Sequence, residues 1–126
     1  MTNATNETRI NSSKSAMTQG SKLEEKFLQL FSELAPNISI ERQFKAIEGR
    51  KFRFDFCIPD SMVLIEIQGG TFSGGRHTRG LGYAADCEKS RLGQMAGYDV
   101  LCYTGKQINT KEVQGLVDYV LSKRVL

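Results

Sequence analysis

The sequence has no apolar run long enough to cross a membrane, and its thiols and imidazole are few and scattered. No run approaches the roughly 18 apolar residues of a membrane-spanning helix, and the N-terminus lacks the apolar stretch of a secretory signal. The three cysteines, Cys57, Cys87 and Cys102, are far apart and form no Cys-x-x-Cys pair. We expect buried free thiols in a reducing compartment, and His77, the only histidine, does not complete a zinc site with them. These absences predict a cytoplasmic protein.

The length and composition predict one globular domain behind a short polar tail. The chain has 126 residues, of which 40% are hydrophobic and 25% charged, so it can bury a core without disulfides. Residues 1 to about 20 are rich in Thr, Asn and Ser and predict a disordered or weakly ordered tail. Residues 21–126 form the predicted domain. The net charge of +3 permits a polyanionic partner without requiring one.

Hydrophobic periodicity predicts the order of helices and strands. Apolar residues at three-and-four spacing predict a first helix from Ser21, its expected N-cap, to Pro36, with Glu24 completing a capping box. Strands are expected at residues 38–44, 52–58 and 62–67, and again at 100–103. Helices are expected at about 81–95, where Gly97 provides a C-cap, and at 113–121. The order αβββαβα predicts an α/β fold with a mixed sheet flanked by helices.

Two acidic residues fall inside strands that are otherwise apolar. Glu66 and Gln68 share one face of the third strand, and Asp55 lies in the second strand between Phe54 and Phe56. Burying a carboxylate is costly unless it is paired or binds a cation, and two facing carboxylates repel each other. A divalent cation such as Mg²⁺ or Mn²⁺ would relieve both costs. The alternative is that Asp55 pairs with Arg53 or another base, and Glu66 with Lys89.

The run Phe54-Asp55-Phe56, a turn and then Ile65-Glu66-Ile67-Gln68-Gly69-Gly70 resembles the PD-(D/E)XK nuclease superfamily. This superfamily includes restriction enzymes, very-short-patch repair endonucleases, Holliday-junction resolvases and some homing endonucleases, and its αβββαβ core matches the order predicted for residues 21–104. The resemblance implies a metal-dependent endonuclease that hydrolyses DNA phosphodiester bonds. It makes Asp55, Glu66 and the Ile67 carbonyl the expected Mg²⁺ ligands.

The resemblance departs from the superfamily pattern at Gln68, which stands where the family has a lysine. Lysine donates to the attacking water and offsets charge near the phosphate, whereas glutamine is neutral. Lys89, on the same side of the second helix as Asp86 and Gly93, is the expected substitute. The alternative is a solvated lysine paired with Asp86. Glu24 resembles the acid that many family members carry on the first helix, and its alternative is the capping-box role alone.

A glycine-rich loop expected from Gln68 to about Gly80 is longer than most connections, and such loops are often functional. The resemblance implies that basic side chains here and near the second strand contact DNA phosphates, namely Arg76, His77, Arg79, Arg53 and Lys51. One alternative is nucleotide binding, although Arg76 and His77 replace the Lys and Ser/Thr of a phosphate-binding loop. Another is a solvated loop without a role, in which His77 is an ordinary surface residue.

Two further functions remain open on the sequence. A catalytically silent nucleic-acid-binding module on the same fold would explain Gln68, but it leaves the retention of Asp55 and Glu66 unexplained. A basic α/β interaction domain that binds no nucleic acid is the third. One domain carries one site, so cutting both DNA strands requires a homodimer, a higher oligomer or two separate visits.

Overall fold

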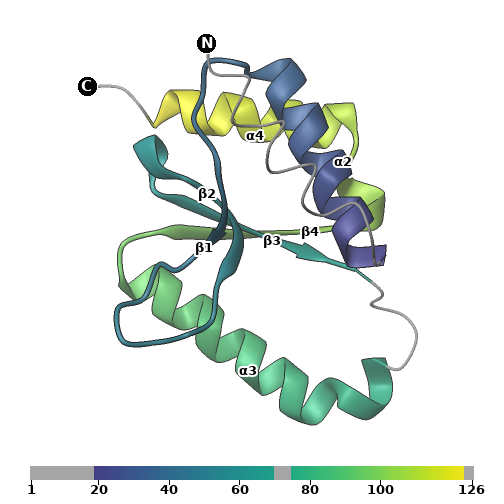
Figure 1. Cartoon of the computed structure of the whole chain (residues 1–126), viewed down its shortest axis with the longest axis vertical. Helices are drawn as coiled ribbons and strands as arrows, with labels where there is room; N and C mark the ends of the chain where they lie inside the picture. The colour runs from purple at the N-terminus through teal and green to yellow at the C-terminus, as the bar shows by residue number, and fades with distance from the viewer. Residues whose placement is uncertain (1–18, 70–74, 124–126) are drawn as a thin grey trace.

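The structure is a computed structural model that describes residues 19–69 and 75–123, and the side chains of residues 21–69 and 82–123. The elements follow one another as α2 (Gln19–Leu34), β1 (Glu41–Phe44), β2 (Phe54–Ile58), the 3₁₀ turn η1 (Pro59–Ser61), β3 (Val63–Gln68), α3 (Gly75–Met95), β4 (Asp99–Thr104), the 3₁₀ turn η2 (Gly105–Gln107) and α4 (Thr110–Ser122). The order of helices and strands, αβββαβα, confirms the fold class expected from the sequence (Figure 1). Among the described residues no helix is long and apolar enough to span a membrane.

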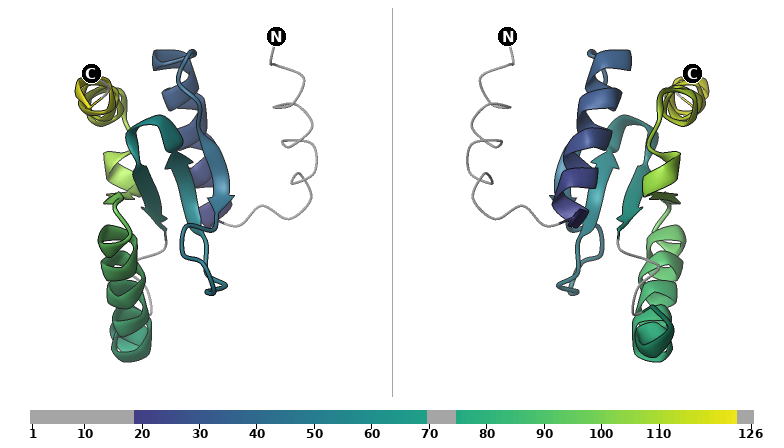
Figure 2. Two further views of the ribbon diagram at one scale, coloured as in Figure 1. Left: turned by 90° about the vertical axis from the view of Figure 1, so that its left-hand side faces the viewer. Right: turned by 90° about the vertical axis from the view of Figure 1, so that its right-hand side faces the viewer.

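The four strands form one mixed sheet in the order β1-β2-β3-β4. Strand β2 runs antiparallel to both β1 and β3, whereas β4 is parallel to β3 and aligns Glu66 with Cys102. Helices α2 and α4 cover one face of this sheet and α3 covers the other (Figure 1). Figure 2 shows that α3 extends past the strands at one end.

The two faces of the sheet bury different side chains. The larger core lies under α2 and α4 and includes Phe27, Phe56 and Ile65. The smaller core lies under α3 and is centred on Phe54, Cys57 and Leu64. Phe54 and Phe56 therefore pack on opposite faces, so the strict alternation expected across residues 52–58 is wrong. The β2–β3 register extends from Ile58 to Phe56, so the change of facing lies where β2 no longer pairs with β3.

Two helix boundaries differ from those expected. Helix α2 begins at Gln19, so Ser21 lies inside it and is not its N-cap. Helix α3 begins at Gly75 and not near residue 81, so the expected glycine-rich loop is shorter. A glycine disfavours a helix by only about 1 kcal/mol relative to alanine, and no proline interrupts residues 75–95. Residues 70–74, on which the phosphate-loop alternative depends, lie outside the described part of the chain.

The C-terminal end of α3 anchors the helix to the sheet. Gly97 adopts the expected left-handed conformation, with φ of 103°, and the Tyr98 N–H donates to the Gly93 carbonyl at 3.1 Å, as in a helix C-cap. A Cβ atom added at Gly93 would lie 2.9 Å from Val100 and 3.2 Å from Phe54. This close approach holds the middle of α3 above β3 and β4, where the candidate site lies.

Candidate active site

Three acidic side chains from three elements meet where β2 leaves the β3 ladder. The Ile67 N–H of β3 donates to the Asp55 Oδ2 of β2 at 2.7 Å, so the Asp55 carboxylate fills the gap between the two strands. Asp55 acts on Glu24 of α2 and on Glu66 of β3, and it raises the pKa of both. The structure thus brings together the three acids predicted from the sequence.

Partial burial and the charge of Asp55 make Glu24 and Glu66 difficult to ionise. The pKa of Glu24 is raised to about 7, first by burial and then by the charge of Asp55, against the opposing effect of Arg42. The pKa of Glu66 is also raised to about 7, first by burial and further by Asp55, although Lys89 opposes the shift. Their side chains are only 19% and 18% exposed. Protein groups therefore compensate the charge of this cluster only in part.

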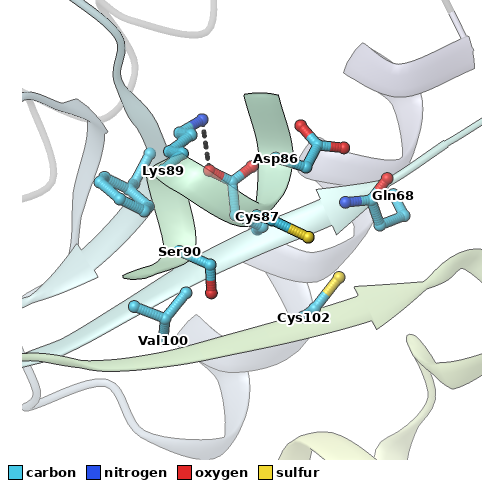
Figure 3. Close-up of a pocket in the computed structure, with 9 residues that line it drawn as sticks. Gln68, Asp86, Cys87, Lys89, Ser90, Val100 and Cys102 are labelled. Carbon is cyan, nitrogen blue, oxygen red and sulfur yellow. Dashed lines mark ion pairs between the residues drawn. The ribbon is translucent and has the colours of Figure 1, made fainter. Parts of the chain in front are cut away.

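Lys89 reaches the cluster from the opposite layer. Its ammonium forms an ion pair with Glu66 Oε2 and lies 4.8 Å from the centre of the Phe54 ring (Figure 3). This Glu66 oxygen is buried and has no hydrogen-bond partner within the described residues, so the ion pair with Lys89 is its main compensation. Lys89 therefore lies against Glu66 at the edge of the acid cluster. The Glu66–Lys89 ion pair is also the contact expected if Glu66 has a structural role and binds no metal.

Arg42 of β1 supports the cluster from the other side, and sequence reasoning missed it. Its guanidinium lies 2.7 Å from Glu25 Oε2, 3.9 Å from Glu24 Oε1 and 5.7 Å from the centre of the Phe56 ring. Arg42 therefore ties α2 to the sheet beside Glu24. The only sequence signal is a basic residue in a four-residue strand.

A pocket of about 210 Å³ opens beside the Glu66–Lys89 pair, between α3 and strands β3 and β4 (Figure 3). Gln68 lines it and shares a side-chain hydrogen bond with Cys102. The pKa of the Cys102 thiol is raised because neighbouring groups partly desolvate it, although the residue as a whole is exposed. Cys87 lines the same pocket, and both thiols are exposed and free. The expectation that all three cysteines are buried is wrong for these two, because the pocket leaves the surface between α3 and β4 open. Cys57 alone is buried.

The basic residues predicted to contact DNA form no ion pair with the acid cluster within the described residues, and the side chains of three of them lie beyond the described part. Lys51 and Arg53 are exposed in the segment between β1 and β2. Their neighbour Arg50 pairs with Glu88 of α3 at 2.9 Å and lies 4.9 Å from the Phe52 ring centre. The backbones of Arg76, His77 and Arg79 belong to α3, but their side chains lie outside the described residues. Asp55 forms no ion pair with Arg53 within the described part of the chain.

The donor chemistry of the cluster suits a hard cation. Carboxylate oxygens are the ligands that Mg²⁺ and Mn²⁺ prefer, and Arg42 and Lys89 offset the repulsion among the three acids only in part. Within residues 21–69 and 82–123, however, no three Asp, Glu, His or Cys side chains converge as a ready-made metal site. Metal binding would therefore require side-chain movements, including release of Glu66 from Lys89.

No protein family, curated protein or solved structure matches this chain.

Proposed function

We propose that this protein is a metal-dependent endonuclease that hydrolyses DNA phosphodiester bonds, with a variant PD-(D/E)XK site. The observation that supports the proposal is the convergence of Glu24, Asp55 and Glu66, all partly buried, with the pKa of Glu24 and of Glu66 raised to about 7. A protein gains no stability from such repulsion, and strongly shifted carboxyls cluster at functional sites.

In the proposed site Asp55, Glu66 and the Ile67 carbonyl would hold Mg²⁺ or Mn²⁺. The cation, when bound, would lower the pKa of a water and stabilise the charge that builds on the phosphate. Lys89, which moves from Glu66 toward the phosphate, supplies the positive charge that the superfamily takes from lysine at the position of Gln68. The Gln68 amide then orients the attacking water through hydrogen bonds.

The proposal extends to the partners and setting of the protein. Arg76, His77, Arg79, Arg53 and Lys51 would hold the DNA backbone through phosphate contacts. Cleavage of both strands would require a homodimer or higher homo-oligomer, or two visits. The three cysteines form no Cys-x-x-Cys pair, which is consistent with a cytoplasmic setting.

The second candidate function is a catalytically silent nucleic-acid-binding module. Two contacts favour it: Lys89 pairs with Glu66, and the Ile67 N–H satisfies one oxygen of Asp55. Both acids thus have protein partners without a metal. The remaining repulsion among the three acids favours the nuclease.

A cleavage assay separates the two functions. Purified protein with Mg²⁺ or Mn²⁺ is expected to nick or cut supercoiled, linear or four-way-junction DNA. Asp55→Ala and Glu66→Ala are expected to abolish cleavage, because each removes a proposed ligand, while Glu48→Ala, at an exposed position, serves as the control. DNA binding without cleavage under both metals would establish the silent module. Loss of both binding and cleavage would exclude both functions.

A further inference from the structure

The size of the pocket beside Glu66 limits what it can hold. Its volume is about 210 Å³, and an apolar cavity of about 150 Å³ is known to accommodate one benzene molecule. A nucleobase is a flat ring with a few substituents and is somewhat larger than benzene. The pocket therefore has room for one base and not for two stacked bases.

The lining suits a flat ring with polar edges. Phe54 and Val100 are the apolar residues that line it, and Gln68, Asp86 and Ser90 supply an amide, a carboxylate and a hydroxyl. Figure 3 shows Gln68 and Asp86 at one end of the pocket, and the Lys89 ion pair at the other. Pockets that read a single base combine such apolar surfaces with hydrogen-bonding groups for the base edge.

The charges of the pocket favour a base over a phosphate. Two carboxyls, Glu66 and Asp86, line it with one ammonium, that of Lys89, and this ammonium already pairs with Glu66. A phosphate would be repelled, whereas a neutral base would not. Asp86 accepts hydrogen bonds and cannot donate when ionised, so it favours bases that carry an exocyclic amino group.

We propose that the pocket between α3 and β3–β4 binds one unpaired nucleobase that carries an exocyclic amino group. This inference rests on the proposed function and names its substrate class: DNA with an unpaired or extruded base next to the bond that is cut. Glu66 belongs both to the pocket wall and to the acid cluster. The bound base would therefore set the position of the neighbouring phosphodiester relative to Asp55 and Glu66.

Binding to DNA that contains 2-aminopurine tests the proposal directly. This base carries an exocyclic amino group, and its fluorescence is quenched when it stacks in a duplex. With EDTA present to prevent cleavage, the full chain is mixed with a duplex that has one bulged 2-aminopurine and with the matching paired duplex. We expect about tenfold tighter binding to the bulged DNA and a change in fluorescence as the base leaves the stack.

Substitutions that fill the pocket supply the matched comparison. Cys87→Phe and Cys102→Phe each add a ring at the pocket, from α3 and from β4, and both positions are exposed. Circular dichroism of each variant checks that the fold is kept. Ala84→Phe adds the same ring to an exposed position of α3 outside the pocket. We expect the two pocket variants to lose the preference for bulged DNA and the fluorescence change, and Ala84→Phe to keep both.

The preference for an amino group has its own test at Asp86. Replacing the bulged base by thymine is expected to weaken binding about tenfold in the unmodified protein. Asp86→Asn is expected to remove this difference, because an amide both donates and accepts hydrogen bonds. Equal binding of thymine and cytosine bulges by the unmodified protein would overturn the predicted base selectivity.

The outcomes separate this inference from the proposed function. Equal binding of bulged and paired DNA, or identical behaviour of Cys87→Phe and Ala84→Phe, would overturn the base pocket while metal-dependent cleavage could still stand. Binding of free cytidine or adenosine monophosphate without any binding of DNA would show a nucleotide site in place of the DNA-base site. Absence of both binding and cleavage of every DNA would exclude the endonuclease together with its pocket.

Discussion

The Lys89 ammonium lies between the Glu66 carboxylate and the Phe54 ring, and it neutralises one of three neighbouring buried acids. An ion pair at low exposure costs desolvation of both ions, so its presence alone is weak evidence for stability. Removal of one partner is more damaging, because the other charge is left buried. A cation at Glu66 would compete with Lys89 for the same oxygen. Substitutions in the Glu66–Lys89 pair are therefore expected to change both the stability of the protein and the proposed metal binding.

Lys89→Met is expected to lower the free energy of unfolding by about 1 to 3 kcal/mol at pH 8, because it leaves Glu66 buried without its cation. Urea unfolding without divalent ions measures the change. The double variant Lys89→Met with Glu66→Gln is expected to recover most of the loss, because a neutral amide replaces the unpaired charge. If the single and double variants are equally unstable, Lys89 acts through packing and the ion-pair argument fails.

The sequence could identify the acids, but it could not identify the hydrogen-bond and ion-pair partners of each. Period two identified Asp55 and Glu66, and helical spacing identified Lys89. Two details depend on tertiary contacts that no local pattern records. Asp55 accepts from the Ile67 N–H between two strands, and Arg42 meets α2 across the sheet.

At the scale of elements, the packing of α3 against the sheet depends on Gly93. An added Cβ would meet Val100, Phe54 and Leu64 at 2.9 to 3.3 Å. Gly93→Ala is expected to lower the free energy of unfolding by about 1 to 3 kcal/mol, because overpacking displaces the helix or its neighbours.

Gly82→Ala on the same helix is the matched control, since an added Cβ there meets nothing within 4 Å. It is expected to raise stability by up to about 1 kcal/mol through helix propensity. Chemical denaturation of both variants measures the difference between them. Equal effects of the two substitutions would mean that α3 does not pack closely on the sheet at Gly93.

Element order was readable from the sequence because each helix and strand carries its own hydrophobic period. The expected helices and strands all exist, and boundaries shifted by a few residues. Two errors share a physical cause. The start of α3 at Gly75 and the opposite facing of Phe54 and Phe56 are not determined by local propensity. Packing of a whole helix or strand against its neighbours overrides the local signal.

At the scale of the whole molecule, the acid cluster exists only because α2, β2 and β3 meet. The repulsion among its acids therefore lowers the stability of the folded state. The pKa values of Glu24 and Glu66 rise from 4.5 to about 7 on folding. The folded state therefore holds more protons than the unfolded state between these values. The stability associated with the protonated acids is fully present below about 4.5 and is lost as the pH rises through about 7.

The free energy of unfolding is accordingly expected to fall between pH 5 and pH 8 by on the order of 2 kcal/mol in EDTA. Glu66→Gln should reduce this dependence and leave the part due to Glu24, and Glu48→Gln, at an exposed position, should leave it unchanged. Mg²⁺ should restore stability at pH 8 but not at pH 5, because it binds the ionised acids and the folded state alone. Thermal unfolding across pH, with and without Mg²⁺, measures both effects. A flat profile would show that the acids are not buried together. Stability that falls with pH but does not respond to Mg²⁺ would show that the acids lie together and bind no metal. The silent nucleic-acid-binding module would then be the better account of this fold.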